Sequence, residues 1–387
     1  MIFDARIQKE AKALREAGYE VTIIYVENEM FLDNIPNLAV AQAKYREVMA
    51  GITSIPVYLH SRKLTFLPRV VRQILQAVEL MVKFTFAVLR NKADYYHCHD
   101  LTPAMFALLG KFWYNAKVVY DAHEFEVPNT TGFINRLWFA YEKKIVTDCA
   151  AAISVNEPIA QEMESRYGKK INVIMNREPF VEDSLLRKTR LREKLQLPPD
   201  SKIVMYVGYL NFDRGINKMT AALAHLPDDV YFCIMGAGNI KAFKEEVAQI
   251  TVSLHIRPER VIFIGPYPPE DIVYILSDAD VSVLLYQTSD YEGNTVNTPN
   301  KLSQSVMARV PILASHNKTL PDVIYRNPFG SIGETVNERN PEEIAAKIIY
   351  MLDKQRNEVY RKHAEMLAYD LSWSPERDKL VQIYHSI

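Results

Sequence analysis

Two basic side chains in the second half of the chain are placed where they can bind an anion. Arg214 lies in the loop 207–215, after a strongly apolar run and just before the next helical pattern. A guanidinium beside the free N–H groups of a helix N-terminus suits a pyrophosphate. The alternative is a surface ion pair between Arg214 and Asp213 or another carboxylate. Lys301 is the second cation, in the run Pro299-Asn300-Lys301 before another helix.

Glycines mark a further loop of the same half. Gly236 and Gly238 follow an apolar run, where glycine allows a backbone to approach a ligand closely. As an isolated glycine pair they are explained equally well by a turn. The two glycines therefore indicate where a ligand could approach the backbone, but they do not indicate which ligand.

Short apolar runs and helical patterns alternate along the chain and must position these loops. The runs are 21–25, 55–59, 117–120, 151–155 and 171–175, then 202–207, 230–235, 261–264, 281–286 and 311–314. This alternation predicts parallel sheets with helices on both faces. Ligands bind beyond the carboxyl ends of such strands, which is where the polar loops lie.

The length of 387 residues and a polar stretch at 177–200 predict two domains. We expect an α/β protein of two Rossmann-like, doubly wound parallel-sheet domains that face a cleft. The first is placed at 1–185 and the second at 186–365. The C-terminal helix at 366–387 is expected to pack back onto the first domain.

Histidines and carboxylates gather after two strands of the first half. His97 and His99 share one face of a strand, as in some metal sites, but we expect no metal there. His123 either hydrogen-bonds a ligand at the reaction centre or is a structural histidine. We expect Asp100 and Glu124 to organise loops or cap helices, with contact to a substrate as the alternative.

The order of these motifs resembles glycosyltransferase family 4 and its relatives with the GT-B fold. A glycine-ended strand, an Arg-Gly pair, a Gly-x-Gly loop and Pro-Asn-Lys before a helix recur there in this order. The segments 96–101 and 119–124 resemble strand ends of that family's first domain, and 373–384 resembles its closing helix. The similarity runs through nearly the whole chain.

The resemblance implies a retaining, metal-independent hexosyltransferase of polysaccharide or glycoconjugate biosynthesis. It uses a nucleotide diphosphate sugar as its donor substrate, needs no cofactor, and has a saccharide or lipid-linked acceptor. Two cations and helix N-termini stabilise the departing diphosphate. The implied catalytic residues are His123, Arg214 and Lys301; the donor-binding residues are Gly208, Arg214, Gly236, Gly238, Asn297, Asn300, Lys301 and Gln304; the acceptor-side residues are His99, Asp100 and Glu124.

Three features depart from the family pattern. Tyr209 stands where many relatives have an arginine, and Gln304 stands where they have a ribose-binding glutamate. The family's first strand and its glycine loop precede the helix that begins here near Asp4, so we expect a gap in the first sheet. These departures leave a non-catalytic subunit that binds nucleotide sugars as one alternative, and a nucleotide-sugar epimerase of the same fold is another.

Composition limits the location and the partners. A formal net charge of −1 argues against nucleic acid as a partner. Three scattered cysteines form neither a disulfide framework nor a zinc ribbon, and the N-terminus has no signal-peptide pattern. We expect a cytoplasmic protein. The stretch 62–92 interleaves basic and apolar residues, which predicts either a helix on an anionic membrane surface or an ordinary amphipathic helix pair.

Overall fold

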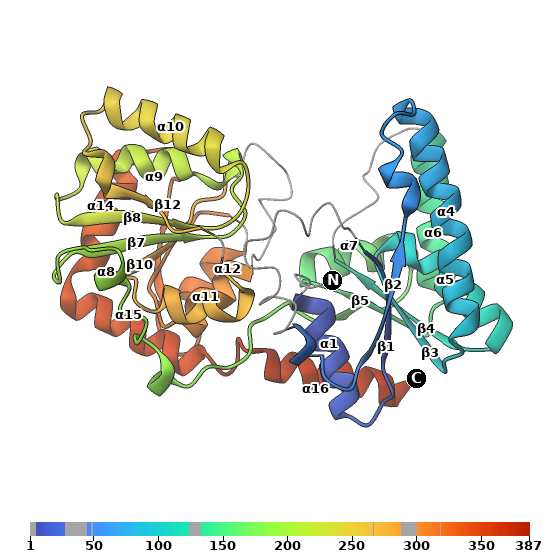
Figure 1. Cartoon of the computed structure of the whole chain (residues 1–387). Helices are drawn as coiled ribbons and strands as arrows, with labels where there is room; N and C mark the ends of the chain where they lie inside the picture. The colour runs from blue at the N-terminus through green and yellow to red at the C-terminus, as the bar shows by residue number, and fades with distance from the viewer. Residues whose placement is uncertain are drawn as a thin grey trace. The chain divides into compact units, whose positions relative to one another are not determined.

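The computed structural model describes residues 5–27, 45–47, 49–123, 133–265, 267–287, 300–317 and 319–387. The chain divides into two compact units, 1–176 with 376–387, and 177–375. Each unit is built on parallel strands with helices between them (Figure 1). The second unit begins at Arg177, earlier than the boundary placed at 186, because Val181 and Leu186 are buried in its core.

The first unit has two separate parallel sheets in the part of the chain that the structure describes. Its strands are β1 (Thr22–Glu27), β2 (Thr53–Tyr58), β3 (Tyr95–His99), β4 (Lys117–Ala122), β5 (Ala151–Ser154) and β6 (Asn172–Val173). The strands β1 and β2 pair with each other, and the other four form a sheet in the order β3-β4-β5-β6. Among the described residues, no strand pairing joins these two sheets. The break between them agrees with the gap in the first sheet that the sequence predicts.

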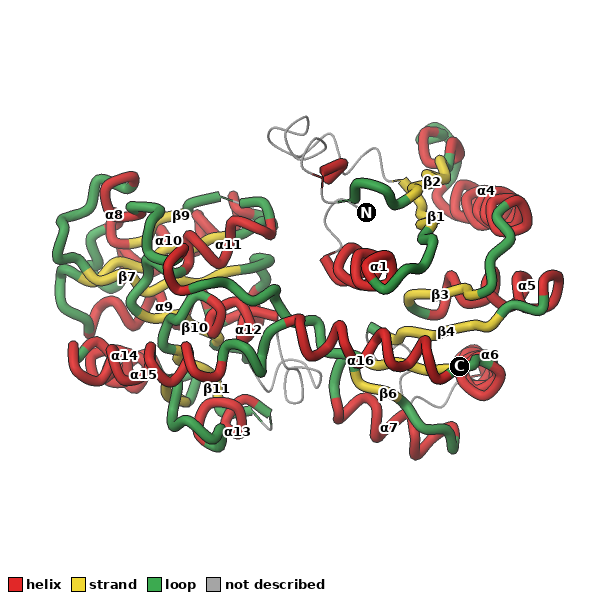
Figure 2. Tube along the Cα trace, turned by 90° about the horizontal axis from the view of Figure 1, so that it is seen from below, coloured by secondary structure: helices red, strands yellow, loops and turns green. Residues whose placement is uncertain are grey.

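The helices of the first unit connect these strands. They are α1 (Ala5–Glu16), η1 (His60–Lys63), α4 (Arg69–Arg90), α5 (Leu101–Tyr114), α6 (Phe133–Asp148), α7 (Glu157–Tyr167) and, at the end of the chain, α16 (Trp373–Ser386). The helix α16 lies along the β3–β6 sheet of the first unit (Figure 2), and the centroid of its Tyr384 ring is 5.3 Å from that of Tyr95 in β3. There the Tyr384 hydroxyl is 2.9 Å from His97 Nδ1, and Glu376 accepts a hydrogen bond from the Met175 amide.

The second unit has one six-stranded parallel sheet in the order β12-β11-β10-β7-β8-β9. Its strands are β7 (Lys202–Val207), β8 (Val230–Met235), β9 (Val261–Phe263), β10 (Val281–Leu284), β11 (Ile312–Ser315) and β12 (Gly333–Val336). Alternate residues of β7 enter different core clusters: Ile203 and Met205 lie in one, Val204 and Tyr206 in the other. Both faces of the sheet are therefore buried, which explains the near-continuous apolar runs.

Helices cover both faces of this sheet. They are η2 (Asp183–Leu185), α8 (Leu191–Lys194), η3 (Phe212–Arg214), α9 (Ile216–Ala222), η4 (Leu223–His225), α10 (Ile240–Ser253), η5 (Pro258–Arg260), α11 (Pro269–Leu276), α12 (Asn300–Met307), α13 (Leu320–Tyr325), α14 (Pro341–Leu352) and α15 (Lys354–Leu367). One core cluster holds side chains of α11, α12 and α13, and the other holds those of α9, α10 and α14. The predicted doubly wound α/β fold is confirmed. Across the described residues, no helix is long and apolar enough to cross a bilayer.

Candidate functional site

The polar loops of the second unit meet at the centre of its sheet. The strands β7 and β10 are neighbours, and the chain leads from them toward opposite edges of the sheet. Loops that follow two such strands diverge, so ligands bind at this switch point beyond the carboxyl ends of the strands. Gly208 follows β7, and Tyr286 lies just beyond the end of β10.

Lys301 and Arg214 share the ring of Tyr286 at this point. Lys301 Nζ is 3.2 Å from the hydroxyl oxygens of both Tyr206 and Tyr286, and lies 4.7 and 5.0 Å from their ring centroids. The Arg214 guanidinium lies 4.3 Å from the centroid of Tyr286. Arg214 Nε is also 3.4 Å from Asp213 Oδ1, so the ion pair considered from sequence is present as well. The structure therefore brings the two predicted cations together.

Gly208 makes room for Lys301. Its φ is +130°, and a Cβ at this position would lie 2.3 Å from Lys301 Cε. Gly236 and Gly238 serve a different purpose, since a Cβ on them would meet Gly208 O and Leu210 at 1.8 and 2.9 Å. These two glycines allow the loops after β7 and β8 to pack together, and so they support the loop that holds Gly208 and Leu210.

Burial sets the protonation behaviour of this cluster. Burial and the nearby Arg214 lower the pKa of Lys301, Asp213 opposes both effects, and together they bring this pKa to about 7. Burial likewise raises the pKa of Tyr286 to about 12 and raises that of Tyr206. The tyrosines therefore stay neutral at physiological pH, while the lysine changes its charge near pH 7.

The remaining predicted donor residues are placed less uniformly. Asn300 is the first residue of α12 and is exposed, whereas Asn297 lies outside the described residues. Gln304 is buried, and its Nε2 donates to Glu178 Oε1 at 3.2 Å. Tyr209, which replaces the expected arginine, is 68% exposed. A carboxylate thus lies beside Gln304, but it comes from Glu178.

Sequence reasoning missed the two tyrosines of the site. Tyr206 is the next-to-last residue of one apolar run and Tyr286 is the last residue of another, so the sequence pattern identifies both as strand residues only. Their positions at the carboxyl ends of β7 and β10 were the available signal, because a phenol there reaches the ligand edge of the sheet. The two tyrosines lie close together because β7 and β10 are neighbours in the sheet, and the sequence does not reveal this strand order.

A second polar cluster lies at the carboxyl ends of β3 and β4 in the first unit. His99 Nδ1 is 2.9 Å from His123 Nε2, and these nitrogens are 3.2 and 3.3 Å from Asp121 Oδ2. Asp100 Oδ1 accepts a hydrogen bond from the His123 amide at 2.9 Å. Asp100 therefore organises the loop after β4, which is the first of its two expected structural roles. Its side chain makes no cap hydrogen bond to α5, so the second role, that of a helix cap, is not the one it has. Glu124 lies outside the described residues.

Arg6 of α1 connects this cluster to the helix α1 and to the strand end near Ile174. Its guanidinium donates to both oxygens of Asp121 at 2.8 Å and to the Ile174 carbonyl at 2.7 Å. Although burial alone would raise it, Arg6 and the adjacent histidines hold the pKa of Asp121 well below its usual range. Burial alone would lower the pKa of His123, but the hydrogen bond and charge of Asp121 raise it. The cluster favours a positively charged His123.

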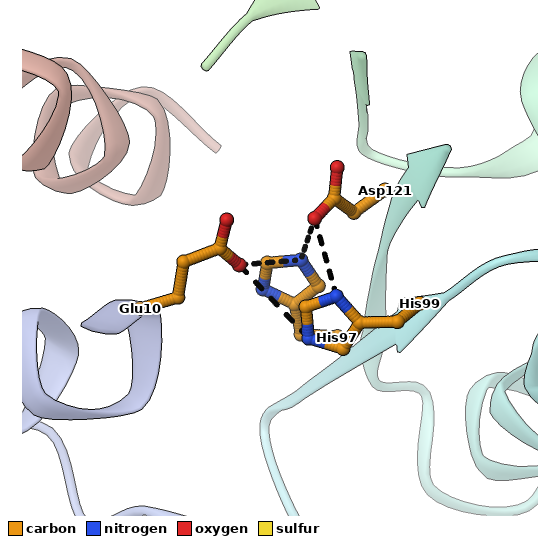
Figure 3. Close-up of side chains that lie close together, drawn as sticks. All are labelled: Glu10, His97, His99 and Asp121. Atoms are coloured by element: carbon orange, nitrogen blue, oxygen red, sulfur yellow. Dashed lines mark ion pairs between the residues drawn. The ribbon is translucent and has the colours of Figure 1, made fainter. Parts of the chain in front are cut away.

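Four side chains of this cluster lie close enough to suggest a metal site: Glu10, His97, His99 and Asp121 (Figure 3). The rings of His97 and His99 are stacked, with centroids 4.6 Å apart and planes only 15° from parallel. A metal ion lies near the plane of each imidazole that binds it, and two stacked rings share no such position. Arg6 also occupies both oxygens of Asp121. This geometry is that of an ion-pair network, and the absence of a functional metal stays a prediction.

The helix α4 exposes an apolar stripe along the predicted membrane segment. The exposed side chains include Val71, Ile74, Val78, Val82 and Phe86, at helical spacing along one face. The opposite face of α4 packs into the first unit through Phe84 and Val88. The helix therefore has two apolar faces. Packing into the core of the first unit accounts for the face with Phe84 and Val88, and it does not account for the exposed face.

Two family models match the chain. Glycosyltransferase Family 4 matches residues 6–176, and Glycosyl transferases group 1 matches residues 187–368. The "uncharacterized glycosyltransferase MJ1607" of Methanocaldococcus jannaschii is 22% identical over 316 residues, which are 76% of this chain and 75% of that protein.

Solved structures share the fold. Anabaena Alr3699/HepE in complex with UDP has a TM-score of 0.71 at 14% identity, covering 98% of this chain and 95% of that one. The same protein in complex with UDP-glucose has a TM-score of 0.68 at 13% identity, covering 95% and 100%. At such identities the likeness establishes the fold alone.

Proposed function

The chain belongs to the GT-B glycosyltransferases, with a family 4 domain in its first unit and a group 1 domain in its second, and from this we propose its reaction. It transfers a hexose-type sugar from a nucleotide diphosphate donor to a saccharide or lipid-linked acceptor, with retention of configuration. The product belongs to a polysaccharide or glycoconjugate. The second unit binds the donor and the first binds the acceptor.

The observation that carries this proposal is the pair of cations on one phenol ring. Lys301 and Arg214 both face Tyr286 at the switch point of the second sheet. The two cations repel each other, Asp213 offsets part of this repulsion, and a ligand of opposite charge between them would offset the rest. A diphosphate carries enough charge to do so, and structural neighbours that bind UDP and UDP-glucose support this choice.

The chemistry follows from where charge develops. As the bond from the anomeric carbon to the diphosphate breaks, negative charge grows on the leaving oxygens and the sugar becomes oxocarbenium-like. Lys301 and Arg214 stabilise that charge electrostatically. These cations supply what a metal would otherwise contribute, so the proposed transfer is metal-independent. His123, whose pKa Asp121 raises against the opposing effect of burial, is the proposed catalytic residue of the first unit, beside His99, Asp100 and Glu124 on the acceptor side.

Calorimetry of purified variants tests the donor site. We expect Arg214→Ala and Lys301→Ala each to abolish saturable binding of UDP and GDP. Matched controls are Arg326→Ala and Lys241→Ala, because both side chains lie on the exposed surface of the second unit. Unchanged affinity in both site variants would remove the basis of the donor assignment.

Product analysis separates this function from its alternatives. A transferase gives a labelled saccharide or lipid from a donor labelled in its sugar, whereas an epimerase returns a labelled nucleotide sugar of altered configuration. A non-catalytic subunit binds the donor and converts none of it. The first outcome supports the proposal, and either of the others replaces it.

We further propose that α4 places the protein on the cytoplasmic face of an anionic membrane. The same helix carries Arg69, Arg72 and Arg90 in addition to the exposed apolar stripe, whereas its Lys83 is paired with Glu79 at 2.6 Å. Apolar contact with basic residues alongside suits a lipid surface with anionic headgroups. Such a site would bring the first unit to a lipid-linked acceptor.

Vesicle co-sedimentation tests this surface. Reversal of charge at Arg69 and Arg72, or replacement of Ile74 and Phe86 by aspartate, should each reduce binding to vesicles containing phosphatidylserine. Arg326→Glu serves as the control for net charge. If vesicle binding is unchanged by both sets of substitutions, α4 is an ordinary amphipathic helix and the membrane proposal is wrong.

A further inference from the structure

Lys301 is held by two phenols in the part of the chain that the structure describes. The Tyr206 hydroxyl donates to the Tyr209 carbonyl at 2.6 Å, so toward Lys301 it acts as an acceptor. The Tyr286 hydroxyl lies at the same 3.2 Å distance on the other side. No carboxylate forms an ion pair with Lys301 among the described residues. Two neutral oxygens thus take the place of a counter-ion.

We propose that Tyr206 and Tyr286 are positioning residues of the donor site, which hold Lys301 so that it gains a proton when the diphosphate binds. This inference rests on the proposed donor function and deepens it. Donor binding then consumes a proton, and the ligand restores a charge that the free protein keeps only in part near neutral pH.

The charges around Lys301 have a clear balance. Arg214 of η3 opposes a second positive charge, Asp213 of the same element favours it, and the phenols of Tyr206 and Tyr286 stay neutral. Burial disfavours the ammonium, and its pKa falls to about 7. A diphosphate between the two cations reverses this balance, because it adds negative charge beside an ammonium that has only neutral hydrogen-bond acceptors among the described residues.

The sign of the pH dependence follows. Below pH 7 the free protein already carries the proton, so binding takes up little. Above pH 7 the binding-competent cation becomes scarce, and the apparent Kd rises about tenfold per pH unit. At pH 8 we expect an uptake of about 0.9 proton per donor bound. The diester phosphates of UDP-glucose do not titrate in this range, so the uptake belongs to the protein.

Two measurements on the full-length protein test the inference. NMR of the lysine side-chain amino groups should show one group titrating near pH 7, and its signal should be absent in Lys301→Arg. Calorimetry with UDP-glucose at pH 8, in phosphate and in Tris, gives the proton uptake from the difference in apparent enthalpy. A lysine that titrates near its ordinary value of about 10.4, or zero uptake despite binding, would overturn the inference.

The phenols are tested by removal of the hydroxyl alone. Tyr286→Phe keeps the ring under Arg214 but removes one acceptor from Lys301, so the midpoint of the affinity profile should move to lower pH. Tyr206→Phe should act in the same direction. Tyr369→Phe, at an exposed position of the same unit, is the matched control. Loss of affinity without a shifted midpoint would indicate a merely structural role and contradict the proposal.

The inference and the donor function fail differently. Binding of UDP-glucose with no proton uptake contradicts the inference and leaves the donor function standing. If neither UDP-glucose nor GDP-mannose binds even at pH 6, where Lys301 is charged, both are contradicted. Binding with uptake that disappears in Lys301→Arg supports both.

Discussion

Replacement of Gly208 by alanine probes the geometry of the donor site. The backbone at Gly208 has φ +130°, which L-residues rarely adopt, and the added Cβ would lie 2.3 Å from Lys301 Cε and 2.9 Å from its Nζ. The lysine is the flexible partner and must leave. Its departure breaks both hydrogen bonds to the phenols of Tyr206 and Tyr286.

The expected magnitude separates into two parts. Backbone strain at such a φ costs about 1–3 kcal/mol of folding stability. Displacement of Lys301 removes a charged contact from the bound diphosphate, and contacts to charged groups contribute about 1.5–3 kcal/mol. Since 1.4 kcal/mol corresponds to a factor of ten, donor affinity should fall at least about tenfold.

Urea unfolding and calorimetry with UDP measure the two parts separately. Gly168→Ala is the matched control, because its φ is +69° and an added Cβ meets nothing within 4 Å. It should lose stability by backbone strain and keep the donor affinity of the wild type. If Gly208→Ala binds UDP as tightly as the wild type, Lys301 does not contact the diphosphate from its observed position.

Three further changes test the polar networks by urea unfolding. Arg6→Ala leaves the buried carboxylate of Asp121 uncompensated and should cost about 3–5 kcal/mol at pH 7; a loss below about 1 kcal/mol would contradict this. Because the folded pKa of Asp121 is depressed, its stabilising contribution is present at neutral pH and should fade as pH falls below the ordinary range of a carboxyl. Gln304→Glu places a second carboxylate beside Glu178 and should cost about 1–3 kcal/mol at pH 7, less at pH 4.5, and an equal cost at both pH values would argue against repulsion. Burial raises the pKa of Glu142 despite its bonds to two tyrosines, so its ionisation destabilises the fold as pH rises through the folded pKa. Glu142→Gln should therefore be less damaging at pH 8 than at pH 5, and the opposite order would refute the assignment.

Much of the fold could be predicted because its sheets are parallel and the six-stranded sheet of the second unit is buried on both faces. Continuous apolar runs mark most strands of the second unit, and the runs end close to the observed strand ends. The strands β3 and β12 have no continuous apolar run, since β3 reads Tyr-Tyr-His-Cys-His and β12 begins with glycine and glutamate. The strand at β3 is predicted from its histidines and its family resemblance, whereas β12 is not predicted. A strand of mixed polarity gives no periodic signal of its own and is recognised only from its neighbours.

The two cations of the candidate site could be predicted from the sequence, but the tyrosines that contact them could not. Arg214 and Lys301 stand out as charges at strand ends, but the phenol of Tyr286, which both of them contact, follows a strand whose place in the sheet depends on topology. The network of Arg6 and Asp121 was missed for a related reason. Residues more than a hundred positions apart form it, and a charged residue on a helix face is expected at the surface unless its partner is known.

The central claim is that Lys301 and Arg214 hold a diphosphate, and phosphorus NMR of UDP tests it most directly. In the presence of the wild-type protein, both phosphorus resonances should shift and broaden, and the Lys301→Ala, Arg214→Ala double variant should return them to the positions of free UDP. Resonances that stay at the free positions with the wild-type protein, at pH 6 and saturating protein, would contradict the account.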